Sequence, residues 1–93
     1  MIQDFACEET KKIYEGKYSK KFPTSIQRIA RRKLIYIDEA EVIEDLMAPP
    51  GNRLEKLKGK RKEQWSIRIN QQYRICFYWD EKRANSLEIT DYH

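Results

Sequence analysis

The chain has 93 residues, of which 40% are hydrophobic and 37% are charged, and 19 Lys and Arg against 15 Asp and Glu give a net charge of +4. This length predicts one domain over residues 1–93, and the mean hydropathy of −0.91 and the absence of an apolar run near 20 residues exclude a membrane-spanning helix. An acidic opening without a signal-peptide pattern, and two distant cysteines (Cys7 and Cys76), favour a cytoplasmic protein with reduced thiols, no metal site and no membrane contact.

The first half of the chain has the spacing of helices. Residues Ile2–Phe5 suit a short first strand, and Glu8–Tyr14 suit a helix with acids in its first turn. Gly16 and Lys17 end that helix. A second helix is predicted to open at Pro23–Ser25, because apolar positions then recur three and four residues apart. Its predicted inward face comprises Ile26, Ile29, Ala30, Lys33, Leu34 and Ile37.

Residues 38–47 predict a third short helical piece, which the turn at Pro49–Asn52 ends. Its predicted inward residues are Val42, Ile43, Leu46 and Met47.

The second half changes to the two-residue period of strands. Residues 64–70 alternate between an apolar and a polar face, and residues 70–72 suit a turn. Residues 74–79 are almost continuously apolar, as expected of a central strand covered on both faces. The last strand is predicted over residues 87–92. Helices followed by a meander of strands predict an α+β fold.

Basic residues gather in two parts of the sequence. Residues 11–33 hold nine bases and one acid, and six of the ten residues in 53–62 are basic, whereas residues 38–45 hold five acids and no base. Such segregation suits a protein that meets a polyanion, with solvated helix faces and a mobile loop as the alternative for each cluster. The second cluster surrounds Gly59 and predicts a clamp on a nucleic-acid backbone. Its lysines and one arginine are Lys56, Lys58, Lys60, Arg61 and Lys62.

Two arginines are predicted to meet on the polar face of the hairpin. Arg68 alternates away from Ile67, and Arg74 begins the next strand directly after the turn. If these strands pair, the two side chains lie near one another and repel unless an anion such as a phosphate binds between them. Two ordinary surface arginines, or an ion pair with Glu88, are the alternatives.

The sequence ends in Asp91, Tyr92 and His93, and His93 is its one histidine. Strand alternation predicts Asp91 and His93 on one face and Tyr92 on the other. An imidazole titrates near neutral pH and can donate or accept a proton. A tyrosine can stack on a base or orient a phosphate, and an aspartate can accept a proton. A merely structural histidine is the alternative.

The second half of the chain resembles the HigB-type toxins of bacterial toxin–antitoxin systems, within the RelE-like ribonuclease superfamily. The resemblance rests on LEKLKGKRKEQWSIRINQQYRICFYW (residues 54–79) and SLEITDYH (residues 86–93). The Leu-Lys-Gly, Trp-Ser-Ile-Arg-Ile-Asn, Tyr-Arg-Ile and Asp-Tyr-His pieces follow the family's order and spacing. It implies a RelE-like fold, in which two N-terminal helices pack on an antiparallel sheet of about four strands.

The resemblance also implies a function. A protein of this kind is the toxin of a type II system, a metal-independent endoribonuclease (mRNA interferase) that cuts mRNA on the ribosome and arrests translation and growth. It needs no cofactor, and an antitoxin of the HigA type, with a helix-turn-helix domain, neutralises it. Residues 11–33 are the predicted contact surface for that antitoxin, with ribosomal RNA as the alternative.

Site residues carry over position by position. The resemblance implies catalytic roles for Asp91, Tyr92 and His93 as acid/base group, for Arg74 as phosphate-stabilising arginine, and for Lys58 of Leu-Lys-Gly. The predicted RNA-binding residues are Arg68, Lys56, Lys60, Arg61 and Lys62.

One departure from the family's pattern leaves a question open. Some members carry a second histidine shortly before Leu-Lys-Gly, where this chain reads Leu54-Glu55-Lys56. The chain then works with a single imidazole, and the general base is not identified. A non-catalytic module that binds RNA or the antitoxin is therefore the alternative function.

Overall fold

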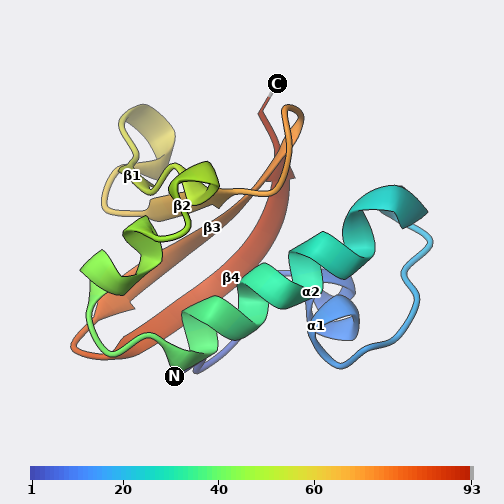
Figure 1. Cartoon of the computed structure of the whole chain (residues 1–93), viewed down its shortest axis with the longest axis horizontal. Helices are drawn as coiled ribbons and strands as arrows, with labels where there is room; N and C mark the ends of the chain where they lie inside the picture. The colour runs from blue at the N-terminus through green and yellow to red at the C-terminus, as the bar shows by residue number, and fades with distance from the viewer. Residues whose placement is uncertain (93) are drawn as a thin grey trace.

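The computed structural model describes residues 1–92, so His93 lies outside the described residues. Two α-helices come first, and an antiparallel sheet with the strand order β1-β2-β3-β4 follows (Figure 1). This arrangement confirms the predicted α+β fold of two N-terminal helices on an antiparallel sheet. The helices are α1 (Glu8–Tyr14) and α2 (Thr24–Glu39), and the strands are β1 (Glu55–Lys56), β2 (Trp65–Arg68), β3 (Tyr73–Asp80) and β4 (Arg83–Asp91).

Both helices form where the sequence predicts them. Helix α1 has the predicted bounds, and α2 begins directly after Pro23, whose fixed φ suits the entry to a helix. The inward face of α2 is the predicted one, except that Ile29 is only partly buried. The helix extends past the predicted boundary and includes Asp38. The Asp38 carboxylate accepts hydrogen bonds from the Ile2 amide (2.9 Å) and the Tyr14 hydroxyl (3.1 Å), which ties the N-terminal segment to both helices.

The predicted first strand over Ile2–Phe5 is wrong. Its two ends make only isolated parallel bridges, with Ala84 and Leu87 of β4. Between them, the Asp4 carboxylate accepts a hydrogen bond from the Ser86 amide at 2.6 Å, and such a side-chain bond replaces a ladder bond. The fourth strand of the sheet is instead β1, a two-residue strand within the basic cluster.

The segment after α2 forms two 3₁₀ helices, η1 (Ile43–Met47) and η2 (Pro50–Asn52), where a helical piece and a turn were predicted. Leu46 is buried and Ile43 is partly buried, as expected. Val42 and Met47 are 49% and 62% exposed, so their predicted inward packing is wrong. Side chains three residues apart align in a 3₁₀ helix, so Ile43 and Leu46 share the inward face and Met47 falls outside it. Val42 precedes the helix in an extended conformation.

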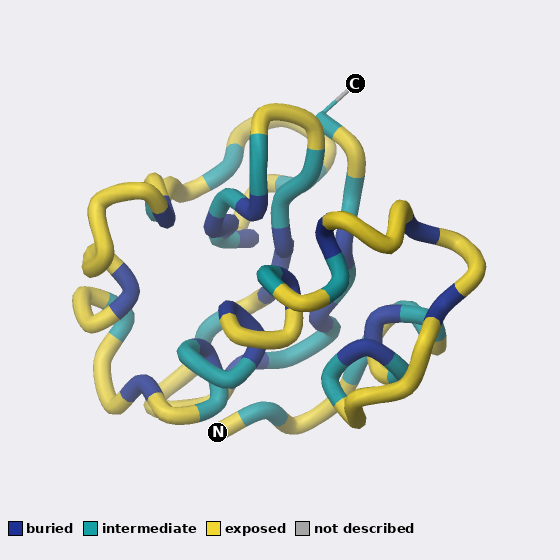
Figure 2. Tube along the Cα trace, turned by 45° about the vertical axis from the view of Figure 1, so that its right-hand side comes forward, coloured by how far each residue is buried: buried dark blue, intermediate teal, exposed yellow. Residues whose placement is uncertain are grey.

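One face of the sheet forms the core with the helices. Ile67, Ile75 and Ile89 lie opposite one another on β2, β3 and β4, and all three are buried in one core cluster with residues of α1 and α2. Figure 2 shows buried segments on both the helices and the strands. Thr10 of α1 accepts a hydrogen bond from the Ile89 amide at 3.0 Å. Because alternate side chains of a strand point to opposite faces, the neighbours of these isoleucines lie on the outer face.

Strand β3 is covered on both faces only in its middle. Residues 75–77 are buried, whereas Tyr78 is 42% exposed, so the prediction of a strand covered throughout is wrong at this end. The predicted turn at residues 70–72 is confirmed. The Asn70 side-chain oxygen accepts hydrogen bonds from the amides of Gln72 (2.8 Å) and Tyr73 (2.7 Å), which fixes the hairpin that joins β2 and β3.

Candidate functional site

The outer face of the sheet brings two arginines together. Arg68 of β2 and Arg74 of β3 are directly opposed partners in the antiparallel ladder, as the sequence predicts. The Arg68 guanidinium donates from Nε to the Asn70 carbonyl oxygen at 3.0 Å, which holds it beside the turn. Like charges opposed across two strands destabilise a sheet unless a counter-charge is present. The pair is therefore a suitable binding position for an anion.

A buried lysine on the core side of the sheet supports the main chain at Arg68. Lys33 of α2 belongs to the predicted apolar face and is indeed buried, and its Nζ donates a hydrogen bond to the Arg68 carbonyl oxygen. Burial lowers the pKa of the Lys33 ammonium, and the positive charges of Arg32 and Arg68 lower it further. The bond anchors the end of β2 on α2 and so fixes the main chain from which Arg68 projects.

Tyr92 follows β4 and covers Arg74. Its amide donates to the Gln72 carbonyl oxygen at 2.7 Å, and the Arg74 guanidinium carbon lies 5.0 Å from the centre of its ring. Burial raises the pKa of the Tyr92 phenol, while the charges of Arg68 and Arg74 oppose that shift. A tyrosine phenol is protonated at neutral pH, and a raised pKa acts in the same direction, so Tyr92 can donate a hydrogen bond to a bound anion.

Two open cavities meet around these side chains, and Glu55 of β1 lines both. One has a volume of about 350 Å³ and holds Arg68 and Tyr92 in its wall; the other, of about 530 Å³, holds Arg74. We call the two together the basic groove, because its lining is mostly cationic. The lining residues are Arg53, Glu55, Lys56, Leu57, Lys58, Lys60, Arg61, Arg68, Gln71, Arg74 and Tyr92.

The Arg74 side chain has an unused donor. Its Nε is buried and makes no hydrogen bond within residues 1–92. A buried donor without a partner is unfavourable, typically by about 1–3 kcal/mol, so such atoms are rare in folded proteins. A ligand with oxygen acceptors bound in the basic groove would satisfy it.

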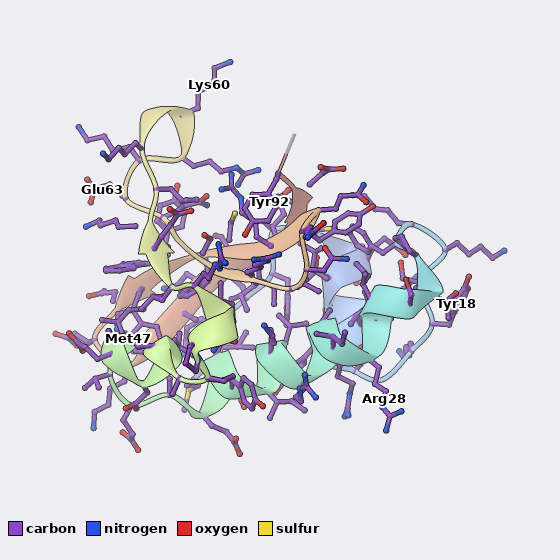
Figure 3. All side chains as sticks on the ribbon, turned by 45° about the horizontal axis from the view of Figure 1, so that its top comes forward. Tyr18, Arg28, Met47, Lys60, Glu63 and Tyr92 are labelled. Carbon is purple, nitrogen blue, oxygen red and sulfur yellow. The ribbon has the colours of Figure 1, made fainter. Side chains whose placement is uncertain are left out.

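Lysines enter the basic groove from the loop between β1 and β2. Lys56 lies on β1 with its Nζ 5.5 Å from the centre of the Trp65 ring. Lys58 and Lys60 flank Gly59 at the start of the 3₁₀ helix η3 (Gly59–Arg61), where the glycine has a φ of +71°. Figure 3 shows the Lys60 side chain extending outward from the tip of this loop. These three lysines are available to a polyanion.

Arg61 has an internal partner on β4, although the sequence predicts it as an RNA-binding residue. Its Nη1 lies 3.1 Å from a carboxylate oxygen of Glu88 and 3.0 Å from the side-chain oxygen of Gln64. Glu88 therefore pairs with Arg61, and among the described residues it forms no ion pair with Arg68 or Arg74. The contact closes the lysine loop over the outer face of the sheet.

Asp91 and Tyr92 lie on opposite faces of the sheet, as strand alternation predicts. Asp91 pairs in register with Tyr73, whose ring packs edge-on against Phe22 on the core side. The Asp91 carboxylate accepts a hydrogen bond from the Gln72 side chain at 2.9 Å. Asp91 thus faces away from Arg74. Lys62 is exposed after η3 and does not line the basic groove, and His93 lies outside the described residues.

Residues 3–93 match the sequence model of a family described as the RelE-like toxin of the type II toxin–antitoxin system HigB. The chain belongs to this family. It is 41% identical over 80 residues to toxin HigB-1 of Vibrio cholerae serotype O1, a match that covers 85% of this chain and 84% of that protein. It is 38% identical over 74 residues to an uncharacterized protein of Haemophilus influenzae, with 80% of this chain and 73% of that protein covered.

The protein is thus a HigB-like toxin of a type II toxin–antitoxin system, which implies a cognate antitoxin as partner. Within residues 1–92 no three His, Cys, Asp or Glu side chains gather as metal ligands, and no helix has the length and apolar character of a bilayer span. The basic groove of this HigB-like toxin also contains Arg53, Glu55 and Gln71, which the sequence did not single out as site residues. Glu55 is the one acid in a run of bases, and that contrast is the signal that sequence reasoning missed.

Proposed function

We propose that this toxin is an endoribonuclease that cleaves mRNA on the translating ribosome and that a HigA-type antitoxin with a helix-turn-helix domain neutralises it. The observation that carries the proposal is the opposed pair of Arg68 and Arg74 beside Tyr92 in a groove lined by lysines. Within residues 1–92 neither arginine of this pair forms an ion pair, and two such cations side by side suit the scissile phosphate of RNA.

The reaction uses the 2′-hydroxyl of the RNA itself as nucleophile. Its oxygen attacks the adjacent phosphorus, a new P–O2′ bond forms, and the P–O5′ bond breaks. The products are a 2′,3′-cyclic phosphate and a 5′-hydroxyl. This step requires a base for the 2′-hydroxyl proton, an acid for the leaving 5′-oxygen, and positive charge against the dianionic phosphorane.

Arg74 is the central charge stabiliser in this proposal. Its unused Nε and its guanidinium fork can bind two oxygens of one phosphate, which a lysine cannot do. Arg68 supports the same phosphate from the opposite strand, and Lys58 contributes charge from the loop. The protonated Tyr92 donates to a phosphate oxygen, with its ring held against Arg74. Lys56 and Lys60 bind neighbouring phosphates of the strand.

Two groups share the proton transfers. Glu55 is the one carboxylate among the described residues that line the groove, and we assign it as the base that accepts the 2′-hydroxyl proton. The register supports this assignment: Glu55 pairs with Ser66, two residues from Arg68 on the same face of the sheet. The His93 imidazolium is assigned as the acid that protonates the 5′-oxygen, since an imidazole titrates near neutral pH.

Asp91 is assigned a supporting role. It faces away from the arginine pair and accepts a hydrogen bond from the Gln72 side chain. The Gln72 carbonyl oxygen in turn accepts a hydrogen bond from the Tyr92 amide. Asp91 therefore orients the turn that positions Tyr92, and no proton transfer is assigned to it.

The test is expression of the chain alone, with growth measured and cleavage of a reporter mRNA mapped by primer extension. Growth arrest with discrete cuts, both abolished by Arg74→Ala, is the expected result. Purified Arg74→Ala protein should still bind ribosomes. Growth at the normal rate under high expression, with an intact reporter, would contradict the proposal and favour a non-catalytic RNA- or antitoxin-binding module.

A further inference from the structure

A second cationic surface lies on the face of α2 that points away from the core. Arg28, Arg31 and Arg32 are all exposed, and their spacing of three and four residues places them on one face of the helix. Between Gly16 and Ile37 the sequence contains seven bases and no acid. With the nearby Tyr18 we call this surface the α2 patch; its members are Tyr18, Arg28, Arg31 and Arg32.

Tyr18 stands beside these arginines in an ordered loop. Its side chain is 63% exposed, and with Arg28 and Arg31 it lines an open cavity of about 230 Å³. The next residue, Ser19, is fully buried and clamped by Gln27 of α2, which accepts from the Ser19 amide (3.0 Å) and donates to the Ser19 carbonyl oxygen (2.7 Å). The aromatic ring is thus presented at a fixed place next to the helix.

The α2 patch is separate from the basic groove. Figure 3 shows Tyr18 and Arg28 at the end of the molecule away from Lys60, with Tyr92 between these ends and nearer to Lys60. The two surfaces also lie on different layers, since α2 covers the core face of the sheet and the arginine pair occupies the outer face. One short RNA strand bound in the groove would not reach the patch.

The composition of the patch favours RNA over a protein partner. Arg31 donates a hydrogen bond from Nε to the Tyr14 carbonyl oxygen at 3.2 Å, which leaves its charge without a counter-charge. Like charges at i,i+3 and i,i+4 on a helix repel, so the charges of Arg28, Arg31 and Arg32 favour a polyanion. Protein interfaces require apolar anchors and few charges at their centre. The described exposed large apolar side chains other than Tyr18, such as Val42 and Met47, are outside this patch. Arginines beside an exposed aromatic ring are the combination that binds a phosphate backbone and stacks a base.

We propose that the α2 patch is a second RNA-binding surface, which docks the toxin on folded RNA of the ribosome while the basic groove holds the mRNA. This inference rests on the proposed function. It assigns the basic 11–33 segment to RNA, and contact of that segment with the antitoxin is the competing outcome.

The experiment measures binding of the toxin to intact, mRNA-programmed ribosomes over a series of KCl concentrations. All proteins carry Arg74→Ala, so that the mRNA stays intact. Arg28→Gln with Arg32→Gln should weaken binding and reduce the slope of log affinity against log salt by roughly 0.7–0.9 for each lost phosphate contact. Tyr18→Ala should weaken binding with no change in that slope. Lys82→Gln with Arg83→Gln, two exposed cations at the opposite end of the sheet, removes the same charge and should change neither quantity.

The outcomes separate this inference from the proposed function. Arg28 and Arg32 are exposed, so the melting temperature of the double variant should match that of the parent protein. Tyr18→Ala provides a second variant, which leaves the charge unchanged. If both variants bind ribosomes with the parent's affinity and salt slope, the inference is overturned. The same holds if they differ from the parent only in failing to co-purify with the product of the neighbouring gene, which would assign the patch to the antitoxin. If the protein with its native Arg74 does not cleave mRNA, the proposed function is overturned, and the ribosome-binding result for the α2 patch is unaffected.

Discussion

The guanidinium carbon of Arg74 lies 5.0 Å from the centre of the Tyr92 ring. This contact holds the arginine and the tyrosine side by side at the basic groove, where both can bind the phosphate proposed above. A cation over an aromatic face gains roughly 0.5–2 kcal/mol, which is enough to prefer one arrangement of two mobile side chains. The contact and the hydroxyl therefore have separable effects.

Tyr92→Phe separates them, because the phenylalanine ring keeps the contact with Arg74 and loses only the hydroxyl. A hydrogen bond to a charged group contributes about 1.5–3 kcal/mol, so cleavage should fall by roughly 10–100-fold with ribosome binding unchanged. Tyr92→Ala should lose more. Single-turnover cleavage of ribosome-bound mRNA measures both. Wild-type cleavage by Tyr92→Phe would show that the hydroxyl has no role, and equal losses in the two variants would show that the ring contact has none.

The raised pKa of Tyr92 predicts the pH dependence of this contribution. Burial favours the neutral phenol in the folded state, so the associated stability is fully present below the ordinary tyrosine pKa and is lost as pH rises through the higher folded value. Between about pH 6 and pH 9, below the ordinary value near 10, wild type and Tyr92→Phe should show parallel cleavage profiles. A step present in the wild type alone would mean that the phenol ionises during the reaction.

Arg74→Ala should reduce cleavage by roughly 10²–10³-fold, the usual loss for one donor to a developing oxyanion. The fold should persist, because Arg74 lies on the outer face and its Nε makes no hydrogen bond within the described residues. Arg74→Lys keeps the charge but not the fork and should recover only a part of the activity. Circular dichroism checks the fold, and a molten Arg74→Ala protein would make the residue structural.

The sequence predicts the hairpin geometry well because two local signals agree there. Alternation places Arg68 outward, and the Asn70 turn sets the register that brings Arg74 opposite to it. The lysine loop is different. Strand β1 has only two residues, too few for a periodic pattern, so neither the strand nor the place of Glu55 in the groove is visible before the fold is known.

A long-range contact and a local change of helix type account for two further differences. Arg61 looks like any other cation of its cluster until β4 brings Glu88 within 3.1 Å, and these residues are far apart in sequence. Val42 and Met47 are hydrophobic and suitably spaced for an α-helix, but the backbone takes the 3₁₀ form, and this changes which side chains face inward. The tertiary structure thus decides the partner of Arg61, and the local backbone decides which hydrophobic side chains of the 42–47 segment face inward.

The Arg61–Glu88 contact is predicted to hold the lysine loop in place. Both side chains are about one-third exposed, so the ion pair should contribute only about 0.2–1 kcal/mol to stability. Arg61→Ala and Glu88→Ala should nevertheless reduce cleavage by similar factors, and the double variant should lose little more than either. If Arg61 instead bound RNA directly, only its own substitution would weaken RNA binding, and Glu88→Ala would strengthen it.

Glu55→Gln tests the assignment of the general base through two opposite effects. Removing a negative charge from a cationic groove should tighten RNA binding, whereas removing the proton acceptor should slow cleavage by roughly 10²–10⁴-fold. RNA binding and single-turnover cleavage are both measured on one preparation of the Glu55→Gln protein, in which Arg74 is native. Faster cleavage together with tighter binding would mean that Glu55 only repels the RNA backbone, and the base would have to be another group.

His93→Gln tests the proposed acid, because glutamine resembles histidine in size and cannot titrate. Loss of a general acid should lower cleavage by roughly 10²–10⁴-fold and leave the melting temperature and ribosome binding unchanged. The wild-type rate should also decline as pH rises and the imidazolium loses its proton, and this decline should be absent in the variant. Asp91→Asn is the matched control: Asp91 faces away from Arg74 and binds Gln72, so its loss should cost less. Primer-extension mapping of a reporter mRNA gives the readout. Native cutting by His93→Gln, with the same pH profile, would remove the imidazole from the mechanism and return the acid role to Tyr92 or Lys58.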